Sequence, residues 1–561
     1  MHGSRLFAFG LFLFSLSWLG YDHYRPWLNF HSEMLAFAGV FILMASALGV
    51  RRPHSLVPRV AVWLSLLVLL PWLQYLWGVN AFAGDALMSS LYLAGLLAAV
   101  FVGYSFGLTR ADSPEGGVLW FMHSLWVMAL VSGAIGMAQW FNVQGPLQMY
   151  VVQSDLGDRA MGNLGQANQL ATLLLLGIAA LACVYERKVI GDLAFFTGAG
   201  FMSGVLVLTQ SRSGLLSVIV VAIFLVWKKR HVSLRLSNWA ILTWVVALVV
   251  GNLLLPSLSE LLLMQEARSL GTTSTFSLRL TMWKQVGAAV LQSPWLGYGW
   301  NQTPSAHAAG AIAYPGTFTY TFAHNFLVDM LAWNGIPLGL LLSGAIAYWF
   351  ITRMSSSKRI EAVYALACLL PVAVHSMLEF PFAYAYFLLT CGLMVGIVEA
   401  VSPARTTVSV RNRWAWCFLT VWLSLGSYIV YEYFLIEEDF RVVRFENLRI
   451  GQTPPSYDIP HVWMLSHMGA MLKAGRQVAK PNMSSEELEN LRTVSARFAY
   501  SALNFRYAQA LGLNGDPQGA KQQLAIIKGM YGDYYYDACI AEIRHLQAVK
   551  YPQFSEILPP Q

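Results

Sequence analysis

Thirteen apolar segments, each of a length that can cross a bilayer, take up most of the first 432 residues of this 561-residue chain. Their approximate limits are 6–20, 34–50, 60–77, 86–108, 118–141, 168–185, 192–210, 213–227, 238–255, 325–350, 360–378, 384–400 and 414–432. Charged residues make up only 12% of the sequence, about half of the share that soluble proteins carry. We therefore expect an all-α, polytopic membrane protein with about 13 transmembrane helices.

The first apolar segment follows Arg5 and resembles a secretory signal peptide at first sight. No small-x-small cleavage site comes after it, because the chain continues Gly20-Tyr21-Asp22. The sequence therefore predicts a first span that is retained.

The distribution of basic residues predicts how the chain is oriented, because cytoplasmic loops of membrane proteins are enriched in Lys and Arg. With the N-terminus in the cytoplasm, the cytoplasmic segments hold 17 of the 36 basic residues, the outer segments hold six, and 13 lie after residue 432. We expect a multi-pass membrane protein with two domains. The transmembrane domain is 1–432, with a large loop at 257–324 on the outer, periplasm-like side, and a helical domain on the same side is 433–561.

The tail after residue 432 has a different composition, with 13 basic and 13 acidic residues. Ser484-x-x-Glu487 is typical of a capping box, and Asp516-Pro517 is typical of an N-cap followed by the first helical residue. Helices are predicted near 461–478, 485–511, 517–531 and 534–550. One helical hairpin of tetratricopeptide style is indicated, although a single hairpin does not make a repeat array.

Basic side chains on the outer side run against the charge bias and call for an explanation. They are Arg25, Arg159, Arg212, Arg268, Arg279 and Lys284. Guanidinium groups bind phosphate with two parallel hydrogen bonds and stay charged. A set of them at one membrane surface, Arg212 and Arg279 above all, suits a lipid-linked pyrophosphate. The alternative is that each pairs with a local carboxylate or a lipid headgroup, which is the preferred interpretation for Arg25 and Arg268.

Two histidines have a context that indicates chemistry. His324 stands where the tenth apolar segment opens, and the positive end of a helix dipole disfavours the protonated imidazole. A neutral imidazole can act as a general base, and an interfacial His bonded to a carbonyl is the alternative. His375 forms a second polar cluster on the outer side with Glu379, which could orient a His or balance an Arg.

Metal ions and cofactors are not expected. The first outer loop has Asp22 and Glu33 as its acids and no paired carboxylates of the DxD type. The five cysteines show no metal-ligand spacing and no disulfide framework. A pyrophosphate leaving group that arginines hold needs neither a metal nor a strong general acid.

Several motifs together resemble a known family. The first set is Pro294-Trp295-Leu296-Gly297-Tyr298-Gly299, His324-Asn325, Asp329 and Gly335-Ile336-Pro337-Leu338-Gly339. These runs resemble the O-antigen ligase/polymerase superfamily, that is, the Wzy/WaaL-like membrane domain. The runs 26–33, 162–169 and 375–388, and a helical domain after the last span, are similar to the PglL-type bacterial protein O-oligosaccharyltransferases. One departure is Ala167, where that family has Pro.

The resemblance implies a GT-C-like membrane glycosyltransferase of the bacterial inner membrane. Its catalytic domain would be 1–432, and its loop at 257–324 and its helical domain at 433–561 would be periplasmic. Such an enzyme moves a preassembled glycan from undecaprenyl pyrophosphate to Ser or Thr of a periplasmic protein such as a pilin. The family's essential histidine corresponds to His324. Its glutamine corresponds to Gln166, and a tyrosine of its later motif to Tyr384 or Tyr386.

The mechanism expected from this resemblance has two parts. Arg212, Arg279, Arg159 and Lys284 hold the donor pyrophosphate, while His324 takes the proton of the acceptor hydroxyl as that oxygen attacks the anomeric carbon. The supporting residues are Gln166, Asn325, His375, Glu379, Tyr384 and Tyr386.

Other functions stay open on the sequence. An O-antigen ligase with a lipid A-core acceptor and an O-antigen polymerase would use the same kind of donor. A polytopic transporter or flippase is a more distant alternative, because the two halves show no paired hydropathy repeat.

Overall fold

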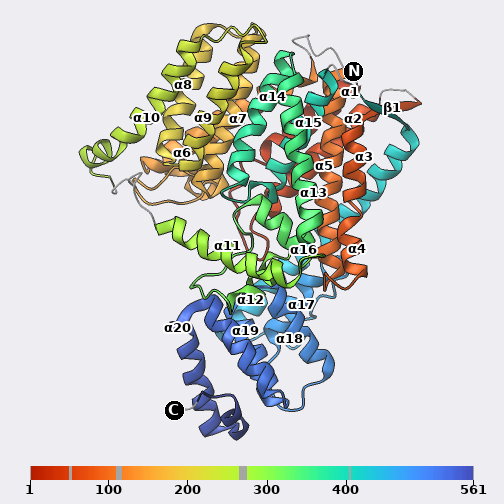
Figure 1. The fold of residues 1–561 in the computed structure, drawn as a ribbon, viewed down its shortest axis with the longest axis vertical. Coiled ribbons are helices and arrows are strands. Elements are labelled where there is room, and N and C mark those ends of the chain that lie inside the picture. Colours follow the sequence, from red (N-terminus) through yellow and green to blue (C-terminus); the bar gives the residue numbers. More distant parts are fainter. Residues whose placement is uncertain (1, 50–52, 109–115, 265–273, 403–405, 560–561) are drawn as a thin grey trace. The chain divides into compact units, whose positions relative to one another are not determined.

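A computed structural model describes residues 2–49, 53–108, 116–264, 274–402 and 406–559 (Figure 1). Five of the basic residues counted for the orientation, Arg51, Arg52, Arg110, Arg268 and Arg405, lie outside these residues. The chain divides into two compact units, each built from three stretches of sequence. Unit 1 comprises Met1–Val68, Leu91–Thr272 and Ile346–Leu425, and unit 2 comprises Leu69–Ser90, Thr273–Ala345 and Gly426–Gln561.

Helices occupy all thirteen apolar segments, and the third segment contains two of them. They are α1 (His2–Leu16), α2 (Phe30–Leu48), α3 (Arg59–Leu67), α4 (Leu70–Leu76), α5 (Ala83–Leu108), α6 (Gly117–Trp140), α7 (Ala167–Glu186), α8 (Asp192–Leu208), α9 (Arg212–Lys228), α10 (Asn238–Leu261), α13 (Phe326–Ser356), α14 (Ile360–Ser376), α15 (Ala385–Val401) and α16 (Asn412–Leu448). Short 3-10 turns occur at η1 (Gly145–Tyr150), η2 (Gly162–Leu164), η3 (Pro381–Ala383) and η4 (Pro552–Glu556).

Eight helical segments of the described chain are long and apolar enough to cross a bilayer, and four further apolar helices are shorter. The expectation of an all-α, multi-pass membrane protein is thus confirmed. The number of 13 spans stays a prediction, as does the division into domains at residue 432.

One small sheet is an exception to the all-helical expectation. Strands β1 (His54–Pro58) and β2 (Thr407–Arg411) pair antiparallel, with Leu56 opposite Ser409. The alternation Thr407-Val408-Ser409-Val410 is typical of a strand, so the sequence carried a local signal for it.

Helix α7 forms the core of unit 1. Every residue from Ala167 to Glu186 except Asn168 is buried. A helix that is apolar all round belongs in the centre of a bundle, and α7 packs against α6, α8, α9 and α14. The N-terminal end of α7 is therefore surrounded by the ends of neighbouring helices.

Unit 2 contains two helices within the segment that the sequence predicts as the large outer loop. These are α11 (Ser274–Gln292) and α12 (Thr303–Ala311). Helix α12 packs against α11, α18 (Ser485–Arg497) and α20 (Pro517–Val549). Two glycines permit the closest approaches, because a Cβ atom at Gly310 would collide with the carbonyl oxygen of Gln285, and one at Gly529 would collide with that of Ala311.

The motif around Gly297 docks on the kink of α13 within unit 2. The amides of Tyr298 and Gly299 donate to the carbonyls of Ala332 and Trp333 at 2.8 and 3.1 Å, and the amide of Ile336 donates to Pro294 at 2.7 Å. Gly335 has a φ of 73° inside α13 and makes the kink. Two motifs about forty residues apart in the sequence therefore form one structural element.

The tail consists of α17 (Ser466–Arg476), α18 (Ser485–Arg497), α19 (Ser501–Leu513) and α20 (Pro517–Val549), which neighbour one another in sequence order (Figure 1). The predicted capping box is confirmed, because Ser484 accepts from the Glu487 amide and Glu487 accepts from the Ser484 amide. Asp516 caps α20 as predicted. The predicted pair of helices at 517–531 and 534–550 is confirmed, because Gly532, with a non-helical φ of 82° and ψ of 175°, divides α20 into two helices at a kink.

The single helix predicted at 485–511 is wrong, since α18 and α19 are separate. The backbone is extended at Phe498 and Tyr500, with φ of −113° and −92°. The guanidinium of Arg497, just before the break, makes three hydrogen bonds of 2.8–3.0 Å with the buried carboxylate of Asp85. The break between α18 and α19 thus lies next to the ion pair of Arg497 with Asp85, and the residues around the break do not predict it.

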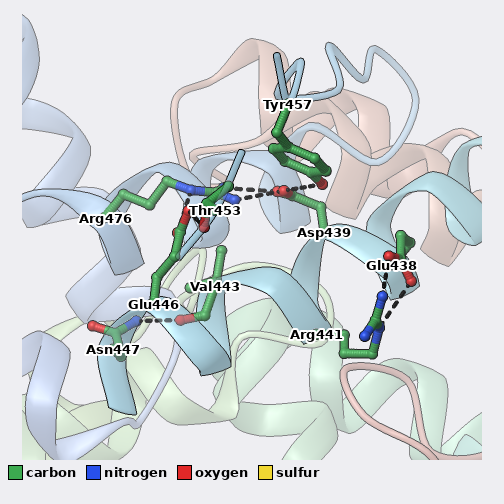
Figure 2. A network of polar contacts seen from close by, with 9 residues as sticks. All are labelled: Glu438, Asp439, Arg441, Val443, Glu446, Asn447, Thr453, Tyr457 and Arg476. Atoms are coloured by element: carbon green, nitrogen blue, oxygen red, sulfur yellow. Dashed lines mark hydrogen bonds and ion pairs between the residues drawn. The ribbon is translucent and has the colours of Figure 1, made fainter. Parts of the chain in front are cut away.

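A polar network joins the C-terminal part of α16 to the segments that follow it (Figure 2). Arg476 donates to both oxygens of Asp439 at 2.6 and 2.8 Å and to Glu446 at 2.9 Å. Tyr457 also donates to Asp439, at 2.8 Å. Because Asp439 is 1% exposed, its charge is balanced inside the protein, and this fixes α17 to α16.

Candidate functional site

The predicted site residues of unit 1 gather around the first turn of α7. Gln166 is its N-cap residue. Three side chains of the following turn, those of Asn168, Gln169 and Thr172, each bond a different neighbouring segment. None of these three was singled out as a site residue from the sequence. The signal for them was present, because they are the polar positions of an otherwise apolar helix.

Asn168 connects two of the outer arginine segments. Its Oδ1 atom accepts from Arg159 Nη2 at 3.0 Å and from the Ser211 hydroxyl at 2.9 Å. Arg159 also donates to the carbonyl of Thr209 at 2.8 Å. Ser211 caps α9, whose first residue is Arg212. The backbone of Arg212 is thereby fixed next to the α7 end, while its side chain is exposed and that of Arg159 is half-buried.

Gln169 connects α7 to the tyrosine motif. Its Nε2 donates to Gln166 Oε1 at 2.9 Å, and its Oε1 accepts from the Tyr386 hydroxyl at 2.7 Å. The rings of Tyr384 and Tyr386 stack with centroids 5.6 Å apart. Tyr386 is 1% exposed, whereas Tyr384 is half-buried. Of the two tyrosines, Tyr384 therefore presents the more accessible ring.

The second polar cluster also meets α7. His375 Nδ1 and the Thr172 hydroxyl form a hydrogen bond of 2.8 Å. Both His375 and Glu379 are buried, and the Glu379 amide donates to the His375 carbonyl at 2.8 Å. We call the polar residues around the first turn of α7 the α7 cluster, and its members are Arg159, Gln166, Asn168, Gln169, Thr172, His375, Glu379, Tyr384 and Tyr386.

Glu33, the last residue of the run 26–33, supports the same cluster, a role that the sequence alone does not predict. Its carboxylate is 3% exposed and accepts from the Trp27 indole at 2.8 Å, from the Ala385 amide at 3.1 Å and from the Tyr92 hydroxyl. It thereby fixes the start of α15 between Tyr384 and Tyr386. A carboxylate inside an apolar segment is the signal that points to such a role.

The other predicted residues belong to unit 2. Arg279 and Lys284 lie on α11, where Arg279 is half-buried and Lys284 is exposed. His324 is expected where the tenth apolar segment, 325–350, opens, and it lies two residues before the first residue of the helix in that segment. Helix α13 begins at Phe326, and Asn325 caps it by accepting from the Val328 amide at 3.2 Å. Asn325 thus has a structural role besides any contact with a substrate.

His324 itself has an unusual backbone. Its φ of 52° lies in the left-handed region, which a side chain with a Cβ atom enters at a cost of about 1–3 kcal/mol. The residue before it, Ala323, is fully buried, and its carbonyl accepts from the Trp283 indole at 2.8 Å. Non-glycine residues with such strain cluster at functional sites, which favours a functional role for His324.

The predicted residues therefore fall into two groups, the α7 cluster with Arg212 in unit 1 and the α11–His324 group in unit 2. That the two groups form one cavity stays a prediction. In the described ranges, no group of three or more His, Cys, Asp or Glu side chains could hold a metal ion. A metal-independent reaction likewise stays a prediction.

Three family models match the chain. A model described as protein glycosylation ligase matches residues 160–182, which include the α7 cluster's central turn. A model described as O-antigen ligase matches 197–343, which include Arg212, Arg279 and His324. A third, described as virulence factor membrane-bound polymerase, C-terminal, matches 363–544.

Two proteins of Acinetobacter baylyi are similar along the chain. A general O-oligosaccharyltransferase is 29% identical over 540 residues, which is 93% of this chain and 92% of the relative. A ComP-specific O-oligosaccharyltransferase is 27% identical over 393 residues, which is 68% of each chain. With the motifs and the site residues described above, these matches support O-linked glycan transfer by a glycosyltransferase that is similar to the PglL-type O-oligosaccharyltransferases and to the O-antigen ligase superfamily.

Proposed function

We propose that this enzyme transfers a preassembled glycan from undecaprenyl pyrophosphate to Ser or Thr of a periplasmic protein, such as a pilin. The reaction would take place at the outer face of the bacterial inner membrane, with the N-terminus in the cytoplasm and the tail in the periplasm. The observation that carries the proposal is the strained backbone of His324, next to a segment that is hydrogen-bonded from both sides.

In this reaction, the oxygen of the acceptor hydroxyl forms a bond to the anomeric carbon of the first sugar. The bond from that carbon to the pyrophosphate oxygen breaks, and the hydroxyl proton passes to the His324 imidazole. Direct displacement inverts the anomeric carbon. A general base of this kind contributes about 10²–10⁴-fold to a rate.

The leaving undecaprenyl pyrophosphate keeps the electron pair and gains negative charge. Arg212, Arg279, Arg159 and Lys284 are proposed to stabilise this charge, because charge-assisted hydrogen bonds to phosphate strengthen as the charge grows. Gln166, Tyr384, Tyr386, His375 and Glu379 are proposed to shape the donor site. The hydrogen bonds among the α7 cluster support this assignment, because they hold polar groups in fixed positions.

The direct test is a transfer assay with purified enzyme, lipid-linked donor and acceptor protein. His324→Ala is expected to lower kcat by about 10²–10⁴-fold, with donor binding retained. His545→Ala is the matched control, since His545 is an exposed histidine of α20, and its rate should stay at the wild-type level. Full transfer by His324→Ala would exclude His324 as the base.

An O-antigen ligase or polymerase is the second candidate, which the matched ligase and polymerase models favour. A deletion in the native host distinguishes the two. The protein-transfer proposal predicts that periplasmic proteins lose their glycan while lipopolysaccharide stays intact. Loss of O-antigen with unchanged protein glycosylation would replace it by the ligase alternative.

A further inference from the structure

Both polar groups of one buried peptide residue, Ala323, are bonded to side chains of different helices. Its amide donates to Asp329 Oδ1 on α13 at 2.8 Å, and its carbonyl accepts from Trp283 Nε1 on α11 at 2.8 Å. The residue is 0% exposed. Ala323 directly precedes His324, so the direction in which the His324 side chain points from the backbone depends on these two hydrogen bonds. We call Trp283, Ala323 and Asp329 the Ala323 clamp.

The α13 side of the clamp is itself fixed. Asp329 is 0% exposed, and the same Oδ1 atom accepts from the Thr303 hydroxyl of α12 at 2.7 Å. The Thr303 oxygen accepts in turn from the indole of Trp333 at 2.8 Å. The Asp329 carboxylate therefore has little freedom to rotate, and it transmits the position of α12 and α13 to the Ala323 amide.

The α11 side of the clamp belongs to the helix that carries Arg279. Trp283 follows Arg279 by four residues, which places the two on neighbouring turns of one helix face. Gln285 ties the same helix to the segment before Ala323. Its Nε2 donates to the Tyr314 carbonyl at 2.7 Å, and its Oε1 accepts from the Tyr320 hydroxyl at 3.0 Å. The segment 314–323 is thus bonded to α11 at three points.

The left-handed conformation of His324 needs such support. A non-glycine residue leaves this region of φ and ψ unless its surroundings hold it there. Hydrogen bonds to both the amide and the carbonyl of Ala323 fix the backbone on each side of its Cα atom. Loss of either bond would let the backbone relax toward an ordinary conformation and move the imidazole.

We propose that Trp283 and Asp329 are positioning residues that set where His324 presents its imidazole, and that Trp283 makes this placement depend on α11, the helix of Arg279. The inference rests on the proposed role of His324 as the base. It adds that one hydrogen bond, from the Trp283 indole, links the position of the proposed base His324 to that of Arg279, a proposed pyrophosphate-binding residue. Neither residue is expected to touch the reacting atoms.

The test compares Trp283→Phe with wild type in the purified transfer assay. Phenylalanine keeps an aromatic ring but has no N–H to donate. Because a misplacement of about 1 Å can cost about 10²-fold in rate, we expect kcat to fall about 10- to 100-fold, with the KM values for donor and acceptor unchanged. Trp244→Phe is the matched control, because its indole donates to Ser203 at 3.0 Å in unit 1, and it should keep the wild-type kcat.

Two substitutions at Asp329 distinguish loss of the hydrogen bond to the Ala323 amide from a general loss of structure. Asp329→Asn keeps a carbonyl oxygen for the Ala323 amide and the Thr303 hydroxyl, so most of kcat should remain. Asp329→Leu has a similar size and no acceptor, and kcat should fall as in Trp283→Phe. If Asp329→Leu does not fold, Thr303→Val replaces it, because it removes the hydroxyl that holds the carboxylate. Wild-type kcat in Trp283→Phe, or equal losses in Asp329→Asn and Asp329→Leu, would overturn the proposal.

A double variant distinguishes failure of the clamp from failure of the base assignment. Trp283→Phe should leave the residual rate of His324→Ala unchanged, because Trp283 acts through His324. A further loss in the double variant would mean that Trp283 has another role. Full activity in His324→Ala would refute the base itself, whereas an inactive His324→Ala beside a fully active Trp283→Phe would refute the clamp alone.

Discussion

The end of α7 in unit 1 and the His324 segment in unit 2 are both polar sites in an apolar chain, and they are built in different ways. The α7 cluster is held by side chains that bond one another, as in the contacts of Gln169 with Gln166 and Tyr386. The His324 segment is held through its backbone, by bonds to the amide and the carbonyl of Ala323. The first arrangement offers many fixed side-chain groups, and the second fixes one side chain.

This difference matches the two tasks of the proposed reaction. The proposed donor is a large lipid-linked glycan with a pyrophosphate, which needs several contacts, so the loss of one contact should weaken its binding. Proton transfer needs one group at one place, so a small displacement should slow the chemical step. We therefore expect substitutions in the α7 cluster to change the KM for the donor, and substitutions around Ala323 to change kcat.

The largest effect in the comparison is expected at Arg212, the exposed arginine beside the α7 cluster. Arg212→Lys keeps the charge but cannot form two parallel bonds to a phosphate. A charged hydrogen bond is worth about 1.5–3 kcal/mol, so kcat/KM for the donor should fall about 10- to 100-fold. Arg492→Lys, an exposed tail position paired with Glu489, should have no effect. A wild-type value for Arg212→Lys would indicate that Arg212 meets a lipid headgroup instead of the donor.

A smaller effect is expected at Asn168, which joins Arg159 to Ser211. Asn168→Leu has a similar size but removes the shared acceptor, which costs about 1–3 kcal/mol for the donors left behind. We expect the donor KM to rise about tenfold while kcat changes less. Asn447→Leu is the control, since Asn447 is exposed and donates to a backbone carbonyl of its own helix. If Asn168→Leu lowered kcat and left the donor KM unchanged, the expected difference between the α7 cluster and the His324 segment would be wrong.

The smallest effect concerns stability near the His324 segment and depends on pH. His307 of α12 is buried and stacks on Tyr320 with ring centroids 4.0 Å apart. Burial lowers the pKa of His307 to about 3 from 6.5. The unfolded chain therefore binds a proton below pH 6.5 that the folded chain does not bind until about pH 3. Stability should fall on acidification in this window, by about 1.4 kcal/mol per pH unit.

His307→Phe keeps a ring against Tyr320 and has no group to titrate. Its apparent melting temperature in detergent should therefore fall less than that of the wild type between pH 7 and pH 5. Transfer activity at pH 7 should be unaffected if α12 keeps its place. An identical acid-induced loss in both proteins would show that His307 does not contribute to it.

Parts of the fold could be predicted because their signals are local. The capping residues Ser484 and Asp516 were found from short motifs, since a cap bonds the backbone three residues away. The break at Phe498 was missed, because it accompanies an ion pair between Arg497 and Asp85, 412 positions apart. Helix α11 lay in a segment predicted as a loop. Its buried face, which includes Met282, Val286 and Ala289, has helical spacing and could have revealed it.

Some site residues could likewise be predicted from the sequence, and others could not. His324 and Gln166 stand in motifs that resemble a known family, so the sequence pointed to them. Asn168, Gln169 and Asp329 gain their importance from partners elsewhere in the chain, such as Tyr386 for Gln169. Trp283 is one of 20 tryptophans, and no local pattern sets it apart from the others.

The sequence by itself determined that this chain is a bundle of membrane helices, where those helices lie and which polar stretches interrupt them. Length and hydrophobicity suffice for that, because a bilayer core satisfies no backbone hydrogen bonds and so demands helices. Only the tertiary structure decided which polar side chains meet at the end of α7, and that Ala323 is held from two helices. Several of these contacts join distant residues, such as Trp283 and Ala323, 40 positions apart, and Gln169 and Tyr386, 217 positions apart. They depend on how helices pack, which local sequence does not encode.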